Sequence, residues 1–214
     1  MNVIEAINAR HSFRAFLTKP VEKDKLNEIL AAAVRTPSWA NSQPWEVFVA
    51  TGDALSLIKA GYKEKYAESA TAAPETPRPK EWSDVAQKRR QQLHPDMVRD
   101  CGNDVDKFGV LNQTMFNAPA VVYICMDKVL SEWSLYDIGA YAQTLMLAAL
   151  EKGLGSIPAI TLTLYPDVLR RVLNIPDNLK VTIGIALGYV DKENGINNFV
   201  SSRSPLSETV RILE

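Results

Sequence analysis

The stretch that decides the fold is LYDIGAYAQTLMLAALEK, residues 135–152. Apolar side chains occupy nearly its whole circumference when it is drawn as a helix, and a helix of that kind belongs in the interior of a protein. Gly153 follows directly and supplies the backbone conformation at which helices commonly end. The sequence therefore predicts a central buried helix over residues 135–152.

The segments on either side mix helical and strand-like patterns without a strict alternation, which favours an α+β fold. On the first helix, capped by Asn2, we expect Val3, Ile4 and Ile7 to face the interior. At 214 residues the chain is long enough for one substantial core, or at most two small ones. Apolar patterning predicts strands at 46–51, 120–126, 156–161 and 181–189, and helices at 2–10, 21–35, 53–66, 84–93, 104–116 and 166–173.

Composition restricts the class of protein. Apolar residues make up 46% and charged residues 23%, as in ordinary globular proteins, and a net charge of −1 disfavours nucleic acid or an anionic membrane as the main partner. Residues 1–13 carry charges where a signal peptide needs an apolar block, and residues 138–150 are too short and too interrupted to span a membrane. We expect a cytoplasmic protein.

Cysteine and histidine are scarce. Cys101 and Cys125 show neither a pairing pattern nor metal-ligand spacing, and Cys125, in the apolar run AVVYIC, is expected to be a buried, reduced thiol. His11 and His94 leave few candidates for a zinc site or a His-dependent catalytic triad. The sequence predicts a metal-free protein.

The segment PSWANSQPW, residues 37–45, cannot be helical, yet it combines Trp39 and Trp45 with hydrogen-bonding side chains. A turn alone needs proline, serine and asparagine but not tryptophan. A site that holds a flat ring with polar edges would use this mixture. Residues 67–82 are rich in proline, alanine and charge, and they predict a long surface excursion that either covers a site or merely decorates the surface.

The segment RHSFRAF, residues 10–16, presents Arg10, Ser12 and Arg14 on one side if it is extended, with His11 and Phe13 on the other. Two guanidiniums beside a hydroxyl can hold a phosphate, but taken alone the segment favours surface salt bridges, because short basic patterns are common. Arg203, in SSRSP, is either a further phosphate ligand or solvated tail.

Two other features are explained without a ligand. The sequence GLGS, residues 153–156, follows a helix and lacks the third glycine of a dinucleotide-binding loop, so it indicates a helix end and a strand start. Asp137 lies in the apolar helix, where we expect it to form a cap or a local hydrogen bond.

Taken in order, these segments resemble the nitroreductase family, whose members are homodimeric flavoproteins with FMN at the subunit interface. The resemblance covers nearly the whole chain, residues 67–110 being the least matched. It implies a single FMN-binding domain over 1–214, with a central, mostly antiparallel sheet packed with helices, in an intertwined homodimer. The motifs that carry it are RHSFRAF, ILAAAVRTPSWANSQPWEVFVATG, FNAPAVVYICMD, YDIGAYAQTLMLAALEKGLGS, YPDVLRRVLNIPDN, GIALGYVD and SSRSPLSETV.

The resemblance also implies roles for individual residues. Arg10 and Ser12 match positions that hold the FMN phosphate, with His11 beside them, and Arg203 closes on the same phosphate. Arg14 matches the basic residue that faces the pyrimidine edge of the flavin, where a positive charge tunes the cofactor. The remaining matches are a loop from the other subunit and a segment along the flavin ring near N5, namely Pro37, Ser38, Trp39 and Asn41 for the loop and Pro158, Ala159 and Ile160 for the segment.

The chain departs from the family pattern at two places. Trp39 stands where relatives more often have a small residue, so it either narrows the substrate space or packs into the dimer interface, whereas Trp45 is expected in the core. Relatives often carry a basic residue where this chain reads Asn112-Gln113-Thr114. Because the local charge there is lower, the reduction potential and the acceptor preference of relatives do not carry over to this chain.

The implied activity is an oxidoreductase in which NADH or NADPH reduces FMN, and a small acceptor such as a nitroaromatic or quinone then takes the electrons at the same site. No side chain needs to act as an acid or base, because the flavin carries the chemistry. Two alternatives stay open at this point. One is a specialised member that dehalogenates or degrades flavin, and the other is a flavin-binding carrier without turnover.

Overall fold

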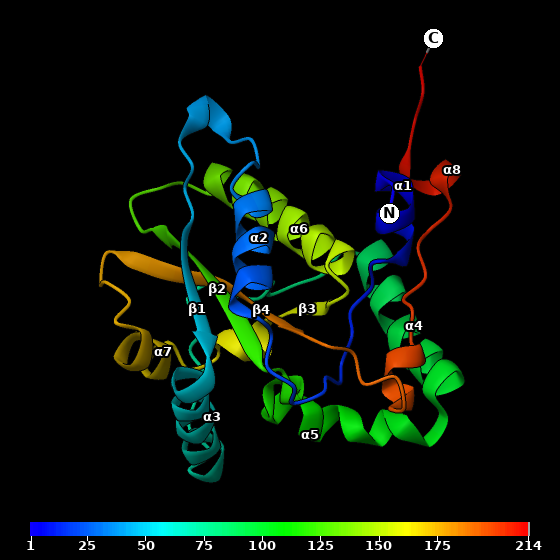
Figure 1. Ribbon diagram of the computed structural model, residues 1–214. Helices are drawn as coiled ribbons and strands as arrows, with labels where there is room; N and C mark the ends of the chain where they lie inside the picture. The colour runs from blue at the N-terminus through cyan, green and yellow to red at the C-terminus, as the bar shows by residue number, and fades with distance from the viewer. Residues whose placement is uncertain (214) are drawn as a thin grey trace.

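The computed structural model describes residues 1–213 and is built on one four-stranded sheet (Figure 1). Its strands lie in the order β1-β2-β4-β3, and every neighbouring pair is antiparallel. This confirms the expected α+β class with an antiparallel central sheet. The strands are β1 Glu46–Thr51, β2 Ala120–Asp127, β3 Gly155–Ala159 and β4 Leu179–Gly188.

Helices cover the sheet and extend beyond it. The α-helices are α1 Val3–Ala9, α2 Lys23–Ala33, α3 Gly52–Ala67, α4 Asp84–Cys101, α5 Phe108–Gln113, α6 Trp133–Glu151, α7 Pro166–Leu173 and α8 Leu206–Thr209. Short 3₁₀ segments are η1 Trp39–Asn41, η2 Gly102–Lys107, η3 Met115–Asn117, η4 Ile160–Thr163 and η5 Gly195–Asn198. The predicted strand 156–161 ends at Ala159, because η4 begins directly after it.

Strand β2 separates two apolar clusters. Successive side chains of a strand point to opposite faces, so Tyr123 and Cys125 join the cluster packed with α3 and α7, while Val122 and Ile124 join the cluster packed with α2 and α6. Both faces are buried, which explains why β2 reads as a continuous apolar run. Cys125 is buried as expected, and burial raises the pKa of its thiol to about 12.

The central helix is confirmed in place but not in its complete burial. Helix α6 packs Ile138, Tyr141 and Leu145 into the core, yet Tyr136 on the opposite side is 77% exposed. Helix α1 is also less buried than the sequence predicts. Asn2 caps α1 through a reciprocal pair of hydrogen bonds with Glu5, as expected of the cap, but no residue of α1 is buried and Val3, Ile4 and Ile7 are all exposed.

The segment predicted as one helix over 104–116 is divided into η2, α5 and η3. Met115, Phe116 and Asn117 all have positive φ, which ends the helix without a glycine. The reversal buries Met115 and Phe116 and lets the Phe116 carbonyl accept a hydrogen bond from Phe16 N–H at 3.1 Å. Helix α4, by contrast, is longer than predicted and continues through Pro95 to Cys101.

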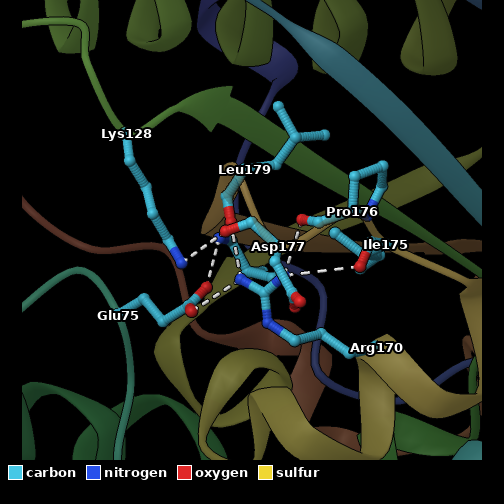
Figure 2. A network of polar contacts seen from close by, with 8 residues as sticks. Glu75, Lys128, Arg170, Ile175, Pro176, Asp177 and Leu179 are labelled. Atoms are coloured by element: carbon cyan, nitrogen blue, oxygen red, sulfur yellow. Dashed lines mark hydrogen bonds and ion pairs between the residues drawn. The ribbon is translucent and has the colours of Figure 1, made fainter.

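The excursion after α3 has no regular element between residues 68 and 83, as expected, but its first half is anchored (Figure 2). Glu75 pairs with Arg170 at 2.6 Å and accepts a hydrogen bond from Val181 N–H at 2.6 Å. Arg170 also donates to the carbonyls of Pro176 and Leu179. Figure 2 shows these groups converging between α7 and the start of β4, so the excursion is fastened to the sheet there.

Candidate functional site

Residues 10–16 run beside strand β3 in an extended conformation. Ser12 forms a parallel bridge with Ser156, and Phe13 N–H donates to the Ser156 carbonyl at 3.1 Å. Gly155 permits this approach, because a Cβ there would lie 2.7 Å from the Phe13 ring. The segment GLGS is therefore a helix end and the beginning of β3, as expected.

Arg10 follows α1 and Arg203 precedes α8, two elements from opposite ends of the chain that lie next to each other in Figure 1. Burial, and after it the positive charge of Arg203, lowers the pKa of the half-buried Arg10. Arg203 donates through Nη1 to the Ser201 carbonyl and hydroxyl and to the Ser202 carbonyl, at 2.8–3.0 Å. The two positive charges repel each other, and an anion bound between them would be stabilised.

Arg14 is held on the inner side of the same segment. Its guanidinium donates to the Ser12 carbonyl at 2.8 Å and lies 4.9 Å from the centre of the Phe199 ring. Burial lowers the pKa of Arg14. Its backbone N–H donates to Asn197 Oδ1 at 2.6 Å, so the η5 turn fixes the segment from the tail side. Sequence reasoning missed Asn197, which carried no local signal.

The alternative use of these arginines, surface salt bridges, is not what the structure shows. Within residues 1–213, no carboxylate lies within salt-bridge distance of Arg10, Arg14 or Arg203. His11 stacks on Phe13 with ring centres 4.0 Å apart, on the shared side expected for them. In the same described range, His11 Nε2 and Arg14 Nε are buried without a hydrogen-bond partner. Unpaired cations and orphaned buried nitrogens fit a ligand rich in acceptor oxygens and nitrogens, as FMN is.

Pro158, Ala159 and Ile160 lie where β3 passes into η4, and all are half-buried. Proline is tolerated here because β3 is an edge strand and needs no donor on that side. Beyond them, the Thr161 hydroxyl donates to Asn112 Oδ1 at 3.2 Å. The neutral segment 112–114 thus contacts the end of this predicted ring-facing stretch.

The loop that carries Pro37, Ser38, Trp39 and Asn41 lies elsewhere. Figure 1 shows the connection between α2 and β1 at the opposite side of the molecule from α1 and the tail. One chain therefore brings together the predicted residues of the N-terminal segment and the tail, but not this loop. Trp39 is 68% exposed, whereas Trp45 is buried against Tyr141 as expected of a core residue.

Asp137, on helix α6, holds this loop, and its hydrogen-bond partner is not the one expected from the sequence. Asp137 is 3% exposed and accepts a hydrogen bond from Trp39 N–H at 3.2 Å, across 98 positions, so the expectation of a cap or local bond was wrong. Beside it, an apolar cleft of about 570 Å³ opens between Trp39 and Trp133. Its polar rim is supplied by the hydroxyls of Ser42, Ser131 and Ser134.

Two features are absent from residues 1–213, a metal-ligand cluster and a membrane-spanning helix. Side chains of histidine, cysteine, aspartate and glutamate form no cluster there of the kind that holds a metal ion. Nor is any helix in that range both long enough and apolar enough to cross a membrane.

The fold and the site define an α+β protein with two arginines that lack a carboxylate partner within residues 1–213, near an edge strand, and with an exposed Trp39 on a loop that is anchored to α6. The family model described as "Nitroreductase family" matches residues 7–189, and the chain belongs to that family. This confirms the resemblance drawn from the sequence motifs.

Individual relatives match over most or all of their length. The chain is 31% identical over 217 residues to the chloronitrobenzene nitroreductase of Comamonas testosteroni, covering 95% of this chain and 93% of that protein. It is 29% identical over 207 residues to the 4-nitrobenzoate reductase of Pseudomonas putida, covering 90% and 87%. The solved structure of the FMN-dependent nitroreductase NfnB from Mycobacterium smegmatis, in complex with NADPH, has a TM-score of 0.90 at 28% identity and 100% coverage of both chains.

Proposed function

We propose that this protein is an FMN-dependent oxidoreductase that uses NADH or NADPH to reduce a small electron acceptor, such as a nitroaromatic compound or a quinone. The observation that carries the proposal is that Arg10 follows α1 and Arg203 precedes α8, which lie next to each other in Figure 1, and that neither arginine has a carboxylate partner within residues 1–213. When bound, FMN supplies the redox chemistry by accepting a hydride from the nicotinamide and passing electrons to the acceptor. Relatives that reduce nitroaromatic compounds, and one solved with NADPH, support this reading.

In this proposal the chain's own residues bind and orient the cofactor. Arg10, Ser12 and Arg203 hold its phosphate, with His11 beside them, because guanidiniums and hydroxyls are strong donors to phosphate oxygens. Arg14, buried against Phe199, places a fixed positive charge at the pyrimidine edge of the ring. Pro158, Ala159 and Ile160, at the end of β3, would line the ring.

The proposal includes a homodimer in which Pro37, Ser38, Trp39 and Asn41 reach the site of the other subunit. Large apolar side chains exposed on α1, α6 and the tail support it, because a monomer seldom leaves so many uncovered. They are Val3, Ile4, Ile7, Trp133, Tyr136, Leu206 and Ile212. Sedimentation should give about twice the chain mass of 23.8 kDa, and a stable FMN-bound monomer would overturn this part of the proposal.

The proposal also includes a cytoplasmic location. Both cysteines are free, and Cys125 is sealed in the core as a thiol. Free thiols are the rule in reducing compartments.

The central test is spectroscopic. The purified protein should carry a flavin absorption band, and anaerobic addition of NADH or NADPH should bleach it, with a nitroaromatic or quinone restoring the colour. A flavin that neither nicotinamide bleaches would indicate a carrier without turnover. Colourless protein that binds no added FMN would reject the proposal.

The phosphate assignment is tested with Arg10→Ala. Loss of a charge-assisted hydrogen bond should weaken FMN about ten- to a hundredfold. Riboflavin, which has no phosphate, should lose little. Equal losses for both ligands would reject the assignment.

A further inference from the structure

The segment that carries Arg203 is held in place by helix α4, which belongs to the least family-like part of the chain. Asp104, just after α4, accepts a hydrogen bond from Gly195 N–H at 2.8 Å, and the Cys101 thiol lies 3.7 Å from the Ile196 carbonyl. Further along the tail, the Ser202 hydroxyl donates to Asp96 Oδ2 at 3.3 Å. The tail is therefore tied to α4 and to the turn after it at successive points, one of which is next to Arg203, and further along the tail Glu208 lies 3.9 Å from Arg89 of α4.

Asp96 is well placed to act as a rigid anchor. It is 5% exposed, and its Oδ1 accepts hydrogen bonds from Arg99 at 2.7 Å and from Gln92 at 3.1 Å. The hydrogen bond from Gln92 is the largest cause that lowers the pKa of Asp96, and the charge and hydrogen bond of Arg99 lower it further. With Oδ1 occupied on the helix side, Oδ2 is left facing Ser202. The carboxylate is thus charged, its charge is neutralised by Arg99, and its orientation is fixed by the hydrogen bonds to Oδ1.

Only Ser202 lies between Asp96 and Arg203 in the hydrogen-bonded chain that joins them. Arg203 Nη1 donates to the carbonyls of Ser201 and Ser202, so the guanidinium is oriented in part by Ser202, the residue that α4 holds. Arg203 itself is exposed, and the cleft of about 530 Å³ between α4 and the tail is open beside it. A long exposed side chain on an untied tail would lose considerable conformational entropy on binding a phosphate. Fixing its backbone beforehand reduces that loss.

We propose that Asp96 is a positioning residue for the cofactor phosphate, acting through Ser202 to present Arg203 to it. The inference rests on the proposed role of Arg203. Asp96 does not contact the phosphate, and its negative charge is compatible with the nearby site because Arg99 neutralises it and Ser202 lies between.

The test compares FMN with riboflavin in single variants of the full-length protein, with affinities measured by quenching of flavin fluorescence. Asp96→Asn leaves one acceptor oxygen for three donors, and the bonds from Arg99 and Gln92 on its own helix leave none for Ser202. The variant should weaken FMN about three- to tenfold, the usual effect of losing one hydrogen bond. Riboflavin should change by less than about twofold, because it lacks the phosphate. Ser202→Ala removes the same link from the exposed tail and should give the same pattern without disturbing the interior of α4. Asp100→Asn is the matched control, since Asp100 pairs with Arg99 from the same helix turn and has no hydrogen bond to the tail within residues 1–213.

A double-mutant cycle separates positioning from general damage. In an Arg203→Ala background, Asp96→Asn should cause no further loss of FMN affinity, because the residue through which it acts is gone. The inference is overturned if Asp96→Asn and Ser202→Ala both bind FMN like wild type while Arg203→Ala does not, or if the Asp96 effect persists in the Arg203→Ala background. If Arg203→Ala weakens FMN and riboflavin equally, the phosphate assignment of the proposed function fails first, and the role of Asp96 fails with it.

Discussion

The carboxylate of Asp137, on helix α6, accepts a hydrogen bond from the backbone N–H of Trp39 at 3.2 Å. The bond fixes the start of the η1 turn, in which Ala40 and Asn41 both have positive φ. One turn further along α6, Tyr141 stacks against Trp45 with ring centres 4.9 Å apart. The loop at residues 37–45 is thus attached at both ends to the helix that forms the core, so its conformation is set before any partner or ligand arrives.

Removing this attachment should loosen the loop. Asp137→Ala deprives Trp39 N–H of its acceptor, and we expect the free energy of unfolding to fall by about 1–3 kcal/mol. Amide hydrogen exchange at Trp39 should accelerate while exchange in β2 stays slow. Asp137→Asn keeps an acceptor oxygen and should retain most of the protection. If both variants exchange like wild type, the hydrogen bond does not hold the loop.

Trp39 should determine which acceptors enter the site. It forms one wall of the cleft that Trp133 lines on the other side. Trp39→Ser restores the small residue more common in the family, and kcat/KM for bulky nitroaromatic acceptors should rise about tenfold relative to small ones. FMN affinity should not change. An unchanged ratio, together with a weakened dimer in sedimentation, would instead assign Trp39 to the subunit interface.

The fold was largely predictable because its signals are local. Strand β1 and helix α7 begin and end where their patterns predict, and β2 differs by one residue. The predictions that failed were those that depend on contacts between residues far apart in the sequence. An apolar stripe on α1 indicates that something must cover it, but not which chain does so, and Val3 is 71% exposed in this one. The reversal at Met115 uses positive φ without glycine, so no sequence signal announced it.

The candidate site divides in the same way. Arg10 and Ser12 were identifiable, because closely spaced donors are a recognisable way to bind an anion. The residues that support them were not. Asn197, Asp96 and Asp137 act through partners far away in the sequence, and an isolated asparagine or aspartate has no pattern that reveals such a partner.

Acid should remove a small contribution that Glu22 makes to stability. The hydrogen bond from Tyr189, at 2.6 Å, is the largest cause that lowers the pKa of Glu22 from its ordinary 4.5 to about 2. Because the folded-state pKa is the lower one, the stabilisation is present above pH 4.5 and is lost as the pH falls toward 2. The side chain is exposed, so screening keeps the effect small.

The measurement for Glu22 is the dependence of the free energy of unfolding on pH in that window. The dependence should be steeper for wild type than for Glu22→Gln. Tyr189→Phe removes only the donor hydroxyl and keeps the ring that lies beside Lys19 and Lys25. It should flatten the dependence in the same direction but to a smaller extent, because a backbone hydrogen bond and the charges of Lys25 and Lys19 also lower the pKa of Glu22. A wild-type slope in both variants would contradict the assignment.

The anchor at Glu75 should stabilise the protein without affecting the cofactor. Glu75→Ala removes the half-buried partner of Arg170 and the acceptor of Val181 N–H (Figure 2). Urea unfolding should show a loss of about 1–3 kcal/mol. Glu81→Ala, at an exposed position of the same excursion, is the control and should change little. Loss of FMN affinity in Glu75→Ala with unchanged stability would contradict this division of roles.

The part of the excursion beyond that anchor should act as a cover over the substrate. Trp82 is partly exposed, and the guanidinium of Arg90, on α4, lies 4.4 Å from its ring centre. It is therefore oriented by the same helix that holds the tail, and it offers aromatic surface to a flat acceptor. Trp82→Ala should raise KM for bulky acceptors, or change the preference among them, while FMN affinity stays near wild type. That combination separates lost substrate contacts from lost cofactor contacts. Arg90→Gln should have a weaker effect in the same direction, because it removes the cation beside the ring but keeps the ring. Unchanged kinetics of Trp82→Ala with every acceptor tried would mean that this stretch only decorates the surface.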